Sequence, residues 1–220
     1  MERWRFERAL RACRASGIPQ IEAYGGTVWP SSETPVLGAP LLALDFELDG
    51  LSRGAHVLQA GWVGVDDGAI NLSSAQSTDV RSLRQLDDQA VTIHGIGEQR
   101  ARGGAALREA VELFLREAAG KIIVAHGAKI EREAIARISK AAFGLAVPVR
   151  TVCTLALERR LKPNLPGIDA YRLSDTRKRY NLPAHDQHDA LADAIAAAEL
   201  LLAQLSRMPH GTRLESVESH

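Results

Sequence analysis

The period of the hydrophobic pattern changes once along the chain. Residues 41–50 begin as a nearly continuous apolar run, which suits a strand buried on both faces, and alternating runs follow at 56–65 and 69–75. The turn Asp66-Asp67-Gly68 joins the last two runs and is typical of a hairpin. Beyond residue 102, apolar positions recur at helical spacing over 105–118, 129–143 and 189–206, with a short apolar strand at 121–125.

This order predicts an α/β fold. An antiparallel β-β-β start followed by βαβ units gives a mixed five-stranded sheet flanked by helices. A strand-helix element is expected over 148–161 and a further helix over 170–180. We divide the chain into an N-terminal helix and linker arm (1–39), a main domain (40–206) and a polar tail (207–220), which we expect to be disordered.

Composition excludes several classes of protein. The formal net charge of zero argues against a tight, sequence-independent coat protein of nucleic acid, although a metal site can still bind phosphate locally. The two cysteines, Cys13 and Cys153, form neither a disulfide framework nor a zinc-ligand spacing. No apolar run approaches the length of a membrane span, and the charged N-terminus lacks the apolar core of a signal peptide. We therefore expect a cytoplasmic protein with no membrane partner.

Two acidic residues stand at the end of the first predicted strand. Asp45 and Glu47 are two apart, so their side chains point to the same face. Carboxylates that close repel each other, and a divalent cation would remove the conflict. The alternative is that the strand has already ended and that both acids are solvated in a turn. These two interpretations are about equally supported by this stretch alone.

Two further acids lie in the predicted helices. Glu131 leans toward the apolar side of helix 129–143, although an acid in a first helical turn is also favoured by the helix dipole alone. Asp193 lies one turn into the last helix and has no obvious cationic partner in the sequence. His188 can share a site with Asp193 only at the transition from loop to helix, with Asp189 as the N-cap. We interpret His185 as an ordinary loop histidine.

Together these residues resemble the motifs of the DEDD superfamily of 3′–5′ exonucleases, in the branch with a catalytic histidine. This branch includes the epsilon proofreading subunits of DNA polymerase III, RNase T and oligoribonuclease. The matching segments are Asp45-Phe46-Glu47 through Gly50, Thr92-Ile93-His94-Gly95-Ile96, Val124 through Glu131, and His188 through Asp193. The resemblance covers residues 40–205. It departs from the family pattern at Glu131, where an aspartate is usual, at Gly127, where an asparagine is usual, and at Leu48-Asp49, where two threonines are usual.

The resemblance implies an RNase H-like fold and a two-metal phosphodiester hydrolysis. By analogy, Asp45, Glu47 and Asp193 would hold one Mg²⁺ or Mn²⁺, and Asp45 with Glu131 would hold a second, roughly 3.5–4 Å away. His188 would take the proton from the attacking water. The substrate would be DNA or RNA with a free 3′ end, the product a nucleoside 5′-monophosphate, and a DNA polymerase is a candidate partner.

Two other functions remain open at this stage. The first is a catalytically weak or inactive module that keeps the nuclease fold to bind nucleic acid or a polymerase, for which Glu131 is the best support. The second is a metal phosphatase that acts on small nucleotides. It would share the metals but would show no dependence on the length of a nucleic-acid chain.

Overall fold

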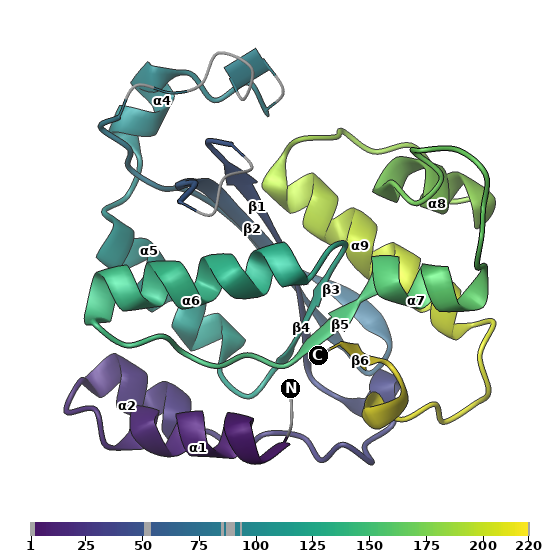
Figure 1. Cartoon of the computed structure of the whole chain (residues 1–220), viewed down its shortest axis with the longest axis horizontal. Helices are drawn as coiled ribbons and strands as arrows, with labels where there is room; N and C mark the ends of the chain where they lie inside the picture. The colour runs from purple at the N-terminus through teal and green to yellow at the C-terminus, as the bar shows by residue number, and fades with distance from the viewer. Residues whose placement is uncertain (1–2, 51–53, 85, 87–90, 93, 220) are drawn as a thin grey trace.

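The computed structural model describes residues 3–50, 54–84, 86, 91–92 and 94–219. Its centre is a mixed sheet in the order β3-β2-β1-β4-β5-β6 (Figure 1). The strands are β1 Leu41–Leu48, β2 Val57–Asp66, β3 Ala69–Asp79, β4 Ile122–Ala125, β5 Thr151–Cys153 and β6 Glu218–Ser219. The first three strands pair antiparallel, and β4 and β5 continue the sheet parallel to β1. The predicted α/β class and mixed sheet are confirmed, but the sheet has a sixth strand that the sequence did not predict.

Helices cover both faces of this sheet (Figure 1). One face carries α1 Arg3–Arg14, α2 Pro19–Gly26, α5 Leu107–Ala118 and α6 Lys129–Phe143, and the other carries α7 Thr154–Leu161, α8 Leu173–Arg179 and α9 Ala190–Leu205. The short helix α4 Glu98–Gly103 follows β3 and was not predicted. No helix in the described ranges combines the length and the apolar character needed to cross a membrane.

The alternation of side chains along β1 assigns its residues to two cores. Leu42 and Leu44 pack in the core under α5 and α6, whereas Leu41 and Ala43 pack in the core under α9. Since Asp45 continues the second series, it lies on the α9 face of the sheet. Asp45 therefore faces α9, the helix that carries Asp193.

The start of α9 lies directly on β2. A Cβ atom at Gly61 would lie 2.2 Å from the backbone of Ala190 and Leu191, so only glycine permits this approach. Next to it, Gln59 Oε1 accepts a hydrogen bond from the Ala190 backbone N–H at 3.0 Å, which satisfies a free donor of the helix end. Gly61 is the partner of Asp45 in the β1–β2 register. The first turn of α9 therefore begins beside the acids of β1.

The N-terminal segment is more structured than the sequence predicted. The helix α2 lies within the stretch that we expected to be a linker or an arm that wraps the surface. Phe6, Leu10 and Tyr24 are buried in the same core as Leu42 and Phe114. Residues 3–26 therefore cover the main core.

The expectation of a disordered tail is wrong. Residues 214–216 form a 3-10 helix, and β6 pairs with β5. Leu214 and Val217 are buried in the core under α9, and Arg150 forms an ion pair with Glu218 at 2.5 Å. Two apolar residues in a polar stretch give too weak a periodic signal to predict this segment, but they are enough to anchor it.

Candidate active site

The end of β1 holds two carboxylates in a largely buried position. The strand continues to Leu48, and Glu47 is only 8% exposed, so the interpretation of a solvated turn is wrong. Burial, followed by the charges of Asp193 and Asp189, raises the pKa of Glu47 to about 7. Burial also raises the pKa of Asp45 well above its ordinary value, with further contributions from Glu131, Asp193, Glu47 and Asp189. These acids repel one another in the absence of a cation.

Glu131 reaches this cluster from the first turn of α6. It is 4% exposed, and burial raises its pKa to about 8, although a hydrogen bond from its own backbone N–H acts in the opposite direction. Among the described residues, no hydrogen-bond partner reaches its Oε2 atom. A carboxylate that served the helix dipole alone would remain solvated, so its burial beside Asp45 supports the inward orientation that the sequence suggested.

Asp193 and His188 complete the cluster from the start of α9. Asp193 Oδ2 accepts a hydrogen bond from the His188 backbone N–H at 2.8 Å. Glu47, His188 and Asp193 each offer one possible ligand atom, and these three atoms lie within 4.8 Å of one another. His188 has φ 65°, a left-handed conformation that costs energy for a residue with a side chain. It lies just before α9, at the predicted transition from loop to helix, and Asp189 caps that helix through the Ala192 N–H at 2.9 Å.

The interpretation of His185 as an ordinary loop histidine is wrong. Its Nε2 atom lies 2.7 Å from Asp193 Oδ1, so Asp193 has a histidine partner that the sequence did not reveal. Both carboxylate oxygens of Asp193 are thus engaged by the segment 185–188. The eight-residue separation crosses a turn before α9 and matches no regular helical spacing, so the sequence offered no signal for this pair.

The donor set fits a hard divalent cation such as Mg²⁺ or Mn²⁺. Asp45, Glu47, Glu131 and Asp193 supply only carboxylate oxygens, the ligand type that these ions prefer. The unpartnered Oε2 of Glu131 and the raised pKa values show buried carboxylates that lack compensation. A bound cation would supply that compensation.

His94 is a further polar group close to this site. Its Nδ1 accepts a hydrogen bond from the Ile96 N–H at 3.1 Å, so Nε2 carries the proton of the neutral ring. Burial, then the charges of Arg100 and His188, lower the pKa of His94, which keeps the ring neutral. Within the part of the chain that the structure describes, Nε2 is buried without a hydrogen-bond partner and is available as a donor. In the sequence, only the resembling segment around it points to His94, and Ile93 of that segment lies outside the described residues.

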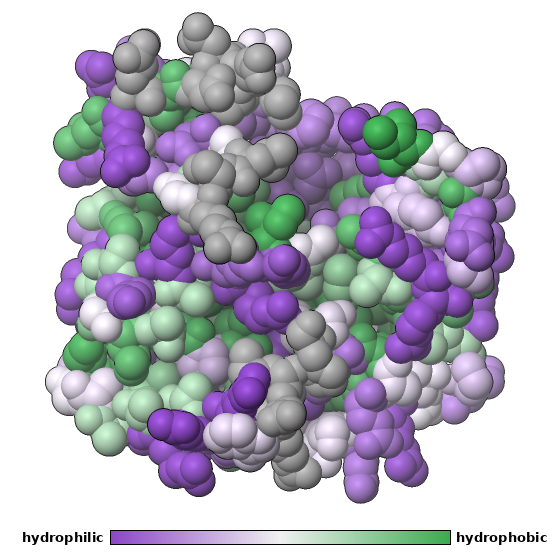
Figure 2. Space-filling view, viewed as in Figure 1, coloured by the Kyte–Doolittle hydropathy of each residue, from purple (hydrophilic) through white to green (hydrophobic). Residues whose placement is uncertain are grey.

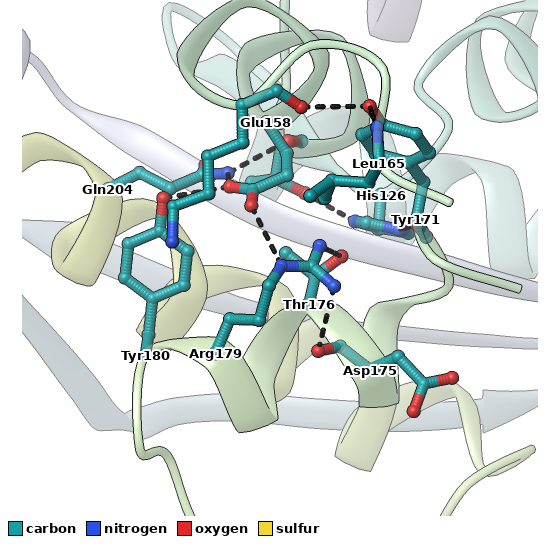
Figure 3. A network of polar contacts seen from close by, with 11 residues as sticks. His126, Glu158, Leu165, Tyr171, Asp175, Thr176, Arg179, Tyr180 and Gln204 are labelled. Carbon is teal, nitrogen blue, oxygen red and sulfur yellow. Dashed lines mark hydrogen bonds and ion pairs between the residues drawn. The ribbon is translucent and has the colours of Figure 1, made fainter. Parts of the chain in front are cut away.

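His126 fixes the neighbouring wall of the site. Its Nε2 donates to the carbonyl of Tyr171 at 2.8 Å (Figure 3). Its Nδ1 lies 2.9 Å from Thr154 Oγ1. Burial is the main cause that lowers its pKa, so the neutral ring bridges both partners. His126 thereby ties the loop after β4 to α7 and to the segment before α8.

A family model with the description Exonuclease (RNase T) matches residues 42–201 of the chain. The chain belongs to the RNase T exonuclease family. The acids of the candidate site, His94, His126 and His188 fall within the matched range.

Two bacterial polymerase sequences are relatives of this exonuclease-family chain. It is 26% identical over 212 residues to the PolC-type DNA polymerase III of Caldanaerobacter subterraneus subsp. tengcongensis, a match that covers 92% of this chain and 15% of the relative. It is 24% identical over 174 residues to the DNA polymerase III subunit epsilon of Aquifex aeolicus, covering 79% of this chain and 84% of the relative. The chain therefore spans only a small part of the PolC-type relative.

Solved exonucleases share the fold. Exonuclease X in complex with 5′ overhanging duplex DNA has a TM-score of 0.63 and 25% identity, and the match covers 80% of this chain and 98% of that chain. Escherichia coli exonuclease I in complex with single-stranded DNA has a TM-score of 0.69 at 18% identity, covering 78% of this chain and 41% of that chain. These matches support the RNase H-like arrangement of the exonuclease-family sheet.

Proposed function

We propose that this chain is a metal-dependent 3′–5′ exonuclease that releases nucleoside 5′-monophosphates from nucleic acid. The observation that carries the proposal is the convergence of carboxylates from β1, α6 and α9 with an imidazole at the same place. Membership in the exonuclease family supports the reaction class. The metal requirement, the polarity and the product are the parts that the experiment below tests.

The roles follow from the chemistry of each side chain. Asp45, Glu47, Glu131 and Asp193 would hold Mg²⁺ or Mn²⁺, and the bound ions would polarise the phosphate and acidify the attacking water. His188 would accept the proton of that water, because imidazole exchanges protons near neutral pH. The ring of His188 is exposed and therefore accessible to water, while the hydrogen bond from its backbone N–H to Asp193 fixes the backbone.

His94 supplies a donor for the bound strand. Its buried Nε2–H would donate to an oxygen of the terminal nucleotide, which would remove the cost of leaving that donor unsatisfied.

We also propose DNA as the first substrate class to test and a DNA polymerase as a partner. The two solved relatives hold DNA, and both sequence relatives are DNA polymerase III proteins. The space-filling view shows hydrophilic residues around a hollow between the α4 side and the α7–α8 side, which suits a charged strand (Figure 2). A cytoplasmic location belongs to the same proposal.

The test is a degradation assay on an oligonucleotide labelled at its 5′ end. With Mg²⁺ or Mn²⁺ we expect a ladder that shortens from the 3′ end, and with a chelator we expect none. Single-stranded DNA, duplex DNA and short RNA are compared side by side. A ladder that persists in Asp45→Asn, or an intact substrate with both metals, would contradict the proposal.

A non-catalytic module is not favoured. Its support was Glu131, but this residue is buried near Asp45, where its carboxylate could bind a metal ion. A phosphatase for small nucleotides is separated by the same assay, because its rate would not depend on chain length.

A further inference from the structure

We propose that Arg159, held on the ring of Tyr171, binds a phosphate of the nucleic acid on the α7–α8 side of the acidic site. This inference rests on the proposed function, and it names a contact to the strand beyond the bond that is cleaved. It assigns a task to an arginine that no motif singles out.

The Tyr171 ring is a fixed platform. Its hydroxyl donates to the Lys162 carbonyl at 2.8 Å and accepts from the Leu165 N–H at 3.1 Å, while its own carbonyl accepts from His126. The guanidinium of Arg159 lies 5.3 Å from the centre of this ring, within the range of a cation–π contact. The Arg159 side chain is exposed, and the contact with the ring holds it in place.

In the described part of the chain Arg159 has no carboxylate partner, whereas two basic residues of the α8 region are ion-paired. Arg172 pairs with Asp169 at 2.6 Å, and Lys178 pairs with Asp175 at 2.8 Å. Across the described residues no carboxylate pairs with Arg159. An exposed guanidinium without a carboxylate is suited to bind phosphate, because its planar donors match the phosphate oxygens.

Arg159 also lies near the acidic site. His126 donates a hydrogen bond to the Tyr171 carbonyl. The charge of Asp193 raises the pKa of His126 and the charge of Arg159 lowers it, so both charged groups lie near this ring. The adjacent residue Glu158 is buried and bonded to Gln204 of α9, so α7 is fixed to the helix that carries Asp193 (Figure 3). A strand that enters the acidic site can therefore meet this cation at a constant separation.

The opposite side of the site differs in this respect. Arg100 of α4 lies near His94 and Asp189, but its charge is compensated by Asp79 at 2.7 Å. The acids of the centre repel phosphate until cations bind, so an uncompensated arginine beside them offers attraction that Arg100 does not.

The test compares Arg159→Ala with Arg160→Ala. Both substitutions remove one positive charge from α7, but Arg160 donates to the Ser216 carbonyl in the C-terminal segment. Binding of a fluorescent single-stranded oligonucleotide is measured by anisotropy with a chelator present, so that it does not depend on hydrolysis. We expect Arg159→Ala to weaken binding about tenfold and to reduce the slope of log affinity against log salt by about one. Arg160→Ala should leave both values near those of the parent chain.

A second measurement separates this inference from the proposed function. A dinucleoside monophosphate contains only the phosphate that is cleaved, so Arg159→Ala should hydrolyse it at the parent rate while its KM for a longer oligonucleotide rises. If the parent chain binds oligonucleotides and both arginine variants behave alike, the assignment of Arg159 is wrong even though the nuclease proposal stands. If the parent chain fails to bind an oligonucleotide, the assignment is wrong as well. If it binds but cleaves neither substrate with Mg²⁺ or Mn²⁺, only the nuclease proposal fails.

Discussion

Two buried acidic groups in this molecule have opposite environments. Glu158 on α7 is fully buried, and its carboxylate accepts from Arg179 at 3.2 Å, Tyr180 at 2.8 Å and Gln204 at 3.0 Å (Figure 3). Asp45 in the candidate site, by contrast, experiences the charges of the carboxylates of Glu131, Asp193, Glu47 and Asp189. The first group joins three helices. In the second, which we call the conflicted group, the carboxylates of Asp45, Glu47, Glu131 and Asp193 repel one another.

The difference separates a structural site from a functional one. A buried carboxylate with hydrogen bonds and a cation contributes to a unique packing of its surroundings. A buried carboxylate among like charges is costly, and it is retained where a ligand removes the cost. The same residue type at similar depth thus serves two purposes, and the partners decide which.

The largest effect is expected from Asp45→Asn, which removes a charge from the conflicted group. We expect the exonuclease rate to fall by at least about 10³-fold, because a ligand of the proposed metals is lost. The metal-free chain should become more stable, by about 1 kcal/mol, because repulsion is relieved. The 5′-label assay measures the rate, and thermal unfolding measures the stability. A stability loss with an unchanged rate would reverse the roles that we assign to the two groups.

The opposite result is expected from Glu158→Gln. This change breaks a buried pair with Arg179 and should lower the free energy of unfolding by about 3 kcal/mol. Chemical denaturation measures the loss. The control is Asp175→Asn on α8, whose exposed pair with Lys178 should contribute little, so its unfolding curve should overlie that of the parent chain. If Glu158→Gln matched this control, the Glu158 group would not be the structural joint that we infer.

The conflicted group also predicts how stability depends on pH. The pKa of Glu131 rises from 4.5 to about 8 on folding, so the folded state binds more protons than the unfolded state between these values. Stability of the metal-free chain should therefore be greatest below about pH 4.5 for this group and should fall as the pH rises to about 8. Mn²⁺ should raise the unfolding temperature more at the upper end of this window, since it binds the deprotonated carboxylates. The matched variant Glu131→Gln should flatten the pH profile, and an unchanged profile would argue against the buried position of Glu131.

The sequence predicted the order of strands and helices because their apolar periods are strong. It also predicted that Glu47 and Asp193 would approach each other, since a strand end and a helix start can be located from local pattern and resemblance. It could not predict the C-terminal segment that ends in β6, because Leu214 and Val217 are the two residues that anchor this segment in the core. The Glu158 group was missed as well, because its partners come from α8 and α9 and become neighbours only through the tertiary fold.

The smallest effect should come from His185, which links the two kinds of environment. Its ring nitrogen Nε2 lies 2.7 Å from Asp193 Oδ1, whereas His188 contacts Asp193 through its backbone N–H. A partner of this kind orients a ligand, so His185→Ala should weaken Mn²⁺ binding about tenfold while changing the unfolding temperature little. Calorimetric titration with Mn²⁺ measures the affinity. His185→Gln keeps a donor on the side chain and should recover part of the lost affinity. Asp186→Ala changes an exposed neighbour and should leave the affinity for Mn²⁺ unchanged. Equal affinities in all three variants would mean that Asp193 needs no orienting partner, and the conflict at the site would then be independent of the loop that precedes α9.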